Sequence, residues 1–161
     1  LSRIMELVND DLIGELENVD NYLTGIMLRF SGAQVEYVSA GHVDMLLRRA
    51  ATGRVERVMP ADGSRHKGYF LGIESMREPF PQMDFRVAKG DLLLLYSDCL
   101  PECISPEGEE FGQERIMRVL AENPHAAPED LMNLLVDRMY EFTQSHALAD
   151  DLTIIALERR V

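Results

Sequence analysis

The spacing of apolar residues predicts short strands over most of the first hundred residues. Apolar runs there alternate with polar residues or stop at turn residues such as Ser31-Gly32 and Thr52-Gly53, which is typical of strands joined by tight turns. The predicted strands are residues 22–30, 35–39, 45–49, 55–59, 83–87 and 92–96. Residues 60–69 are predicted to be a polar loop, and residues 69–73 a short apolar segment that leads back from it. This succession indicates an antiparallel meander.

Helical spacing occurs at the start of the chain and again in its second half. The predicted helices are residues 2–13, residues 114–121 with Ile116, Val119 and Leu120 on one face, and a longer helix with the stripe Leu131, Leu134, Leu135, Met139 and Phe142. We expect this longer helix to begin at Pro128, because proline is tolerated in the first turn. A last strand is predicted over 152–158. The order predicts an α+β fold in which helices cover an antiparallel sheet.

One predicted strand ends at a candidate ligand for a cation. Four leucines and a tyrosine stand between Gly90-Asp91 and Asp98, and so short and unbroken an apolar run is typical of a strand buried on both faces. Asp98 follows this strand, and Asp150-Asp151 directly precedes the last one. Carboxylates at the ends of rigid strands are well placed to hold a hard cation. We therefore predict that Asp98 and Asp150 lie close enough to share or flank one cation.

Composition narrows the class of protein. With 161 residues, 46% of them hydrophobic, the chain is long and apolar enough for one globular domain, and no repeat or linker marks a boundary. The net charge of -12 argues against a nucleic-acid partner, whose phosphates would be repelled. No apolar run approaches the roughly 20 residues of a membrane span, and no signal peptide is visible. These features predict a cytoplasmic protein without membrane contact from this segment.

Five short stretches resemble the metal-dependent PPM protein phosphatases, specifically the bacterial branch typified by stage II sporulation protein E and the stress-response phosphatases. They are residues 37–42, 71–73, 90–98, 106–115 and 150–153. Each stretch alone is a weak signal. Together they fall in the family's order and cover essentially the whole chain, which makes the resemblance specific.

The resemblance implies a fold, a reaction and a ligand set. The fold is a β-sandwich of two antiparallel sheets flanked by helices. The reaction is hydrolysis of phosphoserine or phosphothreonine on a protein by a water that two divalent cations, Mn²⁺ or Mg²⁺, activate. Asp98 and Asp150 would be metal ligands, with Asp151 as neighbour or substitute. The implied partner is a phosphorylated regulatory protein of the anti-anti-sigma type, in the signal transduction that regulates sigma factors.

Two departures from the family pattern change what is expected of this chain. The family's N-terminal segment, which supplies the remaining metal ligands, has no counterpart here, so we expect residues 1–161 to be the C-terminal portion of a phosphatase domain, inactive alone. Its exposed sheet edge would favour a dimer or higher oligomer. The family glycine after the strand-end aspartate is Cys99, which is strained there if that position needs a positive φ or a close approach of the backbone to a metal. These departures leave an alternative open, a degenerate phosphatase domain that binds its regulator without hydrolysis.

Simpler roles stay open for the same residues. Taken alone, Asp98 is more often a turn or helix-cap residue, and Asp150-Asp151 is more often a solvated turn. His42 is expected to be a packed, hydrogen-bonded histidine. Cys99 and Cys103 are expected to be ordinary reduced thiols, because no lysine or arginine lies near Cys99 in sequence to lower its pKa.

Overall fold

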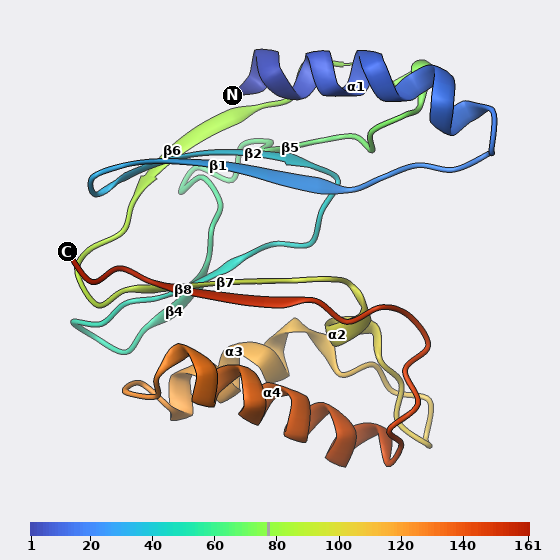
Figure 1. Cartoon of the computed structure of the whole chain (residues 1–161). Helices are drawn as coiled ribbons and strands as arrows, with labels where there is room; N and C mark the ends of the chain where they lie inside the picture. The colour runs from blue at the N-terminus through green and yellow to red at the C-terminus, as the bar shows by residue number, and fades with distance from the viewer. Residues whose placement is uncertain (77) are drawn as a thin grey trace. The chain divides into compact units, whose positions relative to one another are not determined.

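The structure is a computed structural model that describes residues 1–76 and 78–161. The chain forms two compact units, one made of Leu1–His42 and Met59–Val87, the other of Val43–Val58 and Ala88–Val161. Each unit contains its own β-sheet and at least one helix (Figure 1). The predicted α+β class is therefore confirmed.

The first unit is a four-stranded sheet with a long helix against it (Figure 1). Its elements are α1 (Ser2–Glu17), β1 (Gly25–Ser31), β2 (Gln34–Ala40), β5 (Lys67–Gly68), a 3₁₀ turn η1 (Glu74–Met76) and β6 (Gln82–Arg86). Strand β2 pairs antiparallel with β1 and β6 and parallel with β5. Met5 of α1 packs into a small core with Val38, Leu71 and Phe80. Leu1 and Leu12 are partly buried against the same core.

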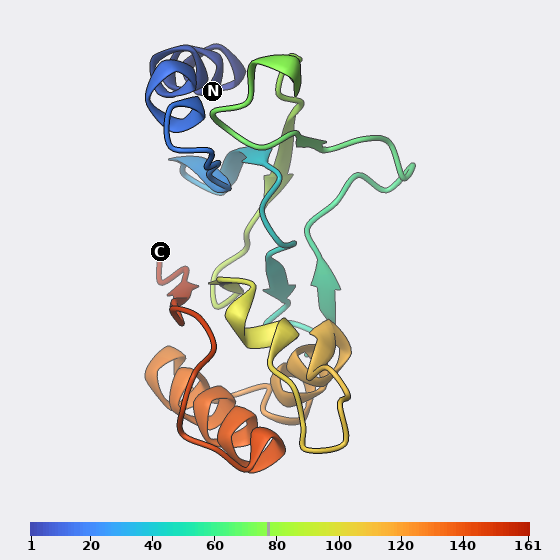
Figure 2. The same ribbon diagram turned by 90° about the vertical axis from the view of Figure 1, so that its right-hand side faces the viewer.

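The second unit holds the leucine-rich strand. Its elements are β3 (Leu46–Arg48), β4 (Val55–Arg57), β7 (Leu92–Tyr96), α2 (Cys99–Glu102), α3 (Gly112–Glu122), α4 (Pro128–Thr143) and β8 (Ile154–Glu158). The sheet order is β4-β3-β7-β8, with every pair antiparallel, and α3 and α4 lie on one face (Figures 1 and 2). Leu92 and Leu94 join the helix stripes in the core, and Leu93 is buried as well. The prediction that both faces of this strand are buried holds for every residue except Leu95, which is half-buried.

Three local features differ from the sequence prediction. Lys67–Gly68 is a short strand inside the predicted polar loop, and the predicted return at 69–73 contributes only an isolated bridge between Leu23 and Leu71. The short helix α2 was not predicted. Helix α1 also continues to Glu17, beyond the predicted end at residue 13. One bridge, two paired residues or one helical turn are too short to leave a hydrophobic period in the sequence.

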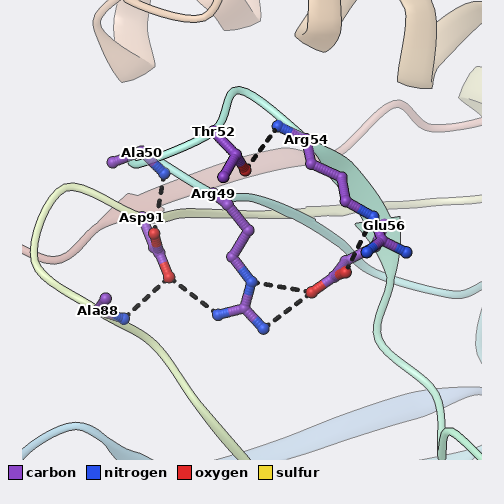
Figure 3. Close-up of polar contacts among 7 residues, drawn as sticks. All are labelled: Arg49, Ala50, Thr52, Arg54, Glu56, Ala88 and Asp91. Atoms are coloured by element: carbon purple, nitrogen blue, oxygen red, sulfur yellow. Dashed lines mark hydrogen bonds and ion pairs between the residues drawn. The ribbon is translucent and has the colours of Figure 1, made fainter.

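A buried aspartate holds the turn that leads into β7 (Figure 3). Asp91 is 1% exposed, and its carboxylate accepts hydrogen bonds from the backbone N–H groups of Ala50 and Ala88, both at 2.9 Å, and from the Arg49 guanidinium at 3.0 Å. Arg49 also pairs with Glu56 at 2.8 Å. This network joins the β3–β4 hairpin to the start of β7, and so fixes where β7 begins.

The pKa of Asp91 depends on two opposing effects, burial and the hydrogen bonds of this network. Burial by itself raises the pKa of Asp91, but the two backbone hydrogen bonds and the Arg49 guanidinium lower it by more, so the net shift is downward. Because a buried charge is tolerated only when it is paired and hydrogen-bonded, Asp91 is an ionised structural residue of the fold.

Candidate functional site

The register of β7 and β8 brings the two predicted aspartate segments to one edge of the sheet. Tyr96 at the end of β7 faces Ile154 at the start of β8. Beyond this pair, Ser97 N–H donates to the Thr153 carbonyl at 2.9 Å, and Thr153 N–H donates to Ser97 Oγ at 3.0 Å. Ser97 Oγ also donates to the Asp151 carbonyl at 3.0 Å. A single serine therefore holds the chain after β7 beside the chain before β8.

Asp98 and Asp150 line the same pocket. The chain turns after Asp98 into the one-turn helix α2, and the Cys99 thiol donates to the Asp150 carbonyl at 3.2 Å. The pocket has a volume of about 280 Å³ and includes both aspartates in its lining. Asp151 is the next residue and is exposed, but it does not line this pocket. The structure thus brings together the two strand ends on which the metal prediction depends.

The Asp98 carboxylate is not used as a helix cap. Asp98 occupies the position before α2, yet its side chain makes no capping hydrogen bond. Its carboxylate has no partner among the described residues, whereas Asp150 Oδ1 accepts the N–H of Asp151 at 2.7 Å. An exposed, unpaired carboxylate beside a pocket is free to meet a cation, and the role of Asp98 as a ligand stays a prediction.

Cys99 fits its position without backbone strain. Within residues 1–76 and 78–161, the non-glycine residues with positive φ are Asp20 and Gln144, so Cys99 adopts the helical conformation of α2. The thiol is buried, and burial raises its pKa, with a further rise from the negative charges of Asp150, Asp98 and Asp151. Cys99 is therefore a protonated structural donor, as the sequence indicated.

The carboxylates fit part of a site for a hard cation. Mn²⁺ and Mg²⁺ prefer carboxylate oxygens, and Asp98 and Asp150 line the same pocket. Within the described part of the chain, no group of three or more His, Cys, Asp or Glu side chains is arranged to hold a metal ion. The roles of Asp98 and Asp150 as metal ligands therefore stay predictions.

Other residues of the matching stretches have simpler roles. In the first unit, His42 Nδ1 and Thr24 Oγ1 are 2.9 Å apart and hydrogen-bonded, as expected for a structural histidine.

Sequence reasoning missed Glu102 and Ile104, which line the same pocket as Asp98. The four-residue spacing from Asp98 to Glu102 was the available signal, because residues four apart lie on one side of a helix.

None of the helices that the described residues form is long and apolar enough to cross a membrane.

Comparison with known proteins identifies the family. Residues 1–160 match the family described as stage II sporulation protein E (SpoIIE). The phosphoserine phosphatase RsbU of Bacillus subtilis is 30% identical over 95 residues, which are 59% of this chain and 28% of RsbU. The chain spans between 23% and 28% of the length of the curated relatives that it matches.

Solved structures share the fold. The SiaA-PP2C domain of Pseudomonas aeruginosa has a TM-score of 0.74 at 15% identity, with 93% of this chain and 57% of that chain covered. The catalytic domain of the serine threonine protein phosphatase PstP, solved with two manganese ions, has a TM-score of 0.60 at 16% identity, with coverages of 92% and 65%. At these identities the likeness concerns the fold. The family match over residues 1–160 shows that this chain belongs to the family described as stage II sporulation protein E (SpoIIE).

Proposed function

We propose that the chain is part of a metal-dependent phosphatase domain that hydrolyses phosphoserine or phosphothreonine in a regulatory protein. The observation that carries this proposal is the pocket that Asp98 and Asp150 both line, at the common edge of β7 and β8. The name of RsbU, a phosphoserine phosphatase, and the two manganese ions in PstP support it. The chain spans 57% and 65% of the two solved domains, which supports its being a portion of a larger domain.

Each residue of the site has a proposed role. Asp98 and Asp150 hold Mn²⁺ or Mg²⁺, with Asp151 as neighbour or substitute. When bound, such cations neutralise phosphate charge and make water a better nucleophile. Ser97 keeps the two ligand segments side by side through its three hydrogen bonds. Because the Cys99 thiol stays protonated, the protein itself supplies no thiolate nucleophile at this pocket.

The proposed substrate is a phosphorylated regulator of the anti-anti-sigma type, in a partner-switching circuit in the cytoplasm. A second function is a degenerate domain that docks this regulator without hydrolysis. It is favoured by the side chains of the described part, where no group of three or more His, Cys, Asp or Glu is arranged to hold a metal ion. The unstrained backbone at Cys99 weighs the other way, because it removes one reason to regard the site as damaged.

The test uses a protein that contains residues 1–161 together with the rest of its phosphatase domain. We expect Mn²⁺- or Mg²⁺-dependent release of phosphate from a phosphoserine protein. Since loss of groups that merely support metal ligands costs about 10–100-fold, Asp98→Ala should reduce the rate by about 100-fold or more. Asp137→Ala removes an exposed carboxylate of α4 and should leave the rate unchanged. Full activity of Asp98→Ala would refute the proposed ligand, and a complete domain that binds its regulator without hydrolysis would favour the docking function.

Residues 1–161 alone should bind one cation weakly and show little or no phosphatase activity, because a two-cation centre needs more ligands than Asp98, Asp150 and Asp151 provide. Calorimetric titration with Mn²⁺ measures this directly. Two tight sites per chain would contradict it.

A further inference from the structure

The pocket beside Asp98 has an apolar lining that the proposed metal site does not use. Ile104 and Leu148 are 51% and 40% exposed, and both line the pocket together with Ala147 and Ala149. Exposed large apolar side chains that converge on one concave site are typical of binding surfaces. The volume of about 280 Å³ is just below the usual range for small-molecule sites, about 300–1,000 Å³. The pocket therefore fits one side chain better than a whole cofactor.

Most polar groups that line this pocket are already satisfied within the protein. Thr143 Oγ1 donates to the Ser145 carbonyl at 2.9 Å, and Ser145 Oγ accepts the N–H of Ala147 at 3.0 Å. The Cys103 thiol donates to the Leu100 carbonyl at 3.2 Å, and burial raises the pKa of Cys103 to about 11, so this thiol is uncharged. These groups contribute neutral surface to the pocket.

Glu102 is the exception in this lining. Its carboxylate is exposed and makes no hydrogen bond or ion pair among the described residues. It follows Asp98 by four residues across α2, and both line the pocket with Asp150. With Asp98 and Asp150 assigned to a cation, Glu102 is the carboxylate that stays available to another ligand.

We propose that this pocket binds a lysine or arginine side chain of the phosphorylated substrate protein. Such side chains combine an apolar stem with a cationic head, which matches an apolar lining that carries one free carboxylate. The stem would contact Ile104 and Leu148, and the head would pair with Glu102. Because Asp98 and Asp150 line the same pocket, the basic residue would lie near the phosphoserine in the substrate. This inference rests on the proposed function for the identity of the ligand, but binding to the pocket can be measured without catalysis.

The binding test uses residues 1–161 and three unphosphorylated peptides that differ only in a central lysine, norleucine or glutamate. Amide NMR titration should show that the lysine peptide shifts the signals of Cys103, Ile104 and Leu148. With Mg²⁺ present to occupy Asp98 and Asp150, Glu102→Gln should weaken the lysine peptide about two- to fivefold, the effect of one exposed ion pair, and should reduce its advantage over norleucine. Glu107→Gln, which removes an exposed carboxylate of the following loop, is the matched control and should change nothing. Equal binding of lysine and norleucine peptides, or shifts confined to other residues, would overturn the proposal.

A second readout separates this proposal from the proposed function. Phosphoserine peptides with lysine or norleucine at successive flanking positions are assayed with Mn²⁺ and the complete domain. A lysine preference in kcat/KM that Glu102→Gln removes without lowering kcat supports the pocket. Phosphatase activity without any lysine preference overturns the pocket alone. Selective lysine binding without any hydrolysis overturns the proposed function and leaves the pocket standing.

Discussion

Strand β7 has an aspartate near each end, and the two have opposite surroundings. Asp91, before the strand, is buried and accepts three hydrogen bonds, one of them from Arg49 (Figure 3). Asp98, after the strand, is exposed and has no partner among the described residues. The same side chain therefore serves the fold at one end of the strand and remains available for chemistry at the other.

The difference shows how to separate structural from functional carboxylates in a domain of this kind. Protein donors that hydrogen-bond to both oxygens of a carboxylate stabilise its ionised form and leave few lone pairs to bind a cation. A carboxylate held at a strand end with free oxygens contributes little to stability and can bind one. Asp91 and Asp98 should therefore respond to mutation in opposite ways.

The largest expected difference is in stability. Asp91→Ala removes one of the two carboxylates that pair with Arg49 and the acceptor of the part-buried N–H groups of Ala50 and Ala88, which should lower the free energy of unfolding by about 3 kcal/mol. Asp98→Ala removes no protein contact and should change it by less than about 0.5 kcal/mol. Urea unfolding followed by circular dichroism measures both variants. Comparable losses in the two would mean that Asp98 is also part of the fold.

A smaller effect is expected at Cys99, next to Asp98. Cys99→Gly restores the residue usual in the family, but glycine in a helix costs about 1 kcal/mol and the buried thiol loses its hydrogen bond to Asp150. We expect a loss of about 1–2 kcal/mol by urea unfolding and no gain in phosphatase activity of the complete domain. A severalfold gain in activity would instead show that the cysteine impairs the site.

The smallest effect concerns acid stability. The pKa of Asp91 is lowered in the folded protein, so its contribution is fully present above the unfolded value of about 3.9 and is lost as the pH falls through the folded-state pKa. Asp91→Asn should therefore make the stability less dependent on pH in this acid range. Unfolding free energies of both proteins between about pH 2 and about pH 6 test this. An unchanged slope would show that another carboxylate dominates acid unfolding.

Much of the fold could be predicted from hydrophobic periodicity. The strand at 92–96 and the start of the long helix at Pro128 were predicted correctly, because each has a long or unbroken apolar pattern. Helix α2 and the pair Lys67–Gly68 were missed, since one turn and two residues carry no period. Their positions depend on tertiary contacts that lie far away in sequence.

The site was only partly predictable for a related reason. Asp98 and Asp150 could be singled out by their positions at strand ends and by resemblance to the family. Asp91 was interpreted only as part of a turn, because its partners Arg49 and Ala50 lie about forty residues earlier and nothing in the local sequence indicates the pairing. The same holds for Glu102 and Leu148, which only the fold brings into one pocket.

Paramagnetic broadening by Mn²⁺ tests the central claim most directly. The two ends of β7 are roughly 20 Å apart, because each strand residue adds about 3.3 Å, so amide NMR of residues 1–161 can separate them. With a small amount of Mn²⁺, signals of residues 97–103 and 149–153 should broaden first, those of Ala88 and Asp91 should persist, and Asp98→Ala should remove the broadening. Broadening centred on another acidic stretch, such as residues 107–110, or unchanged in Asp98→Ala, would contradict the assignment of Asp98 and Asp150 to a cation.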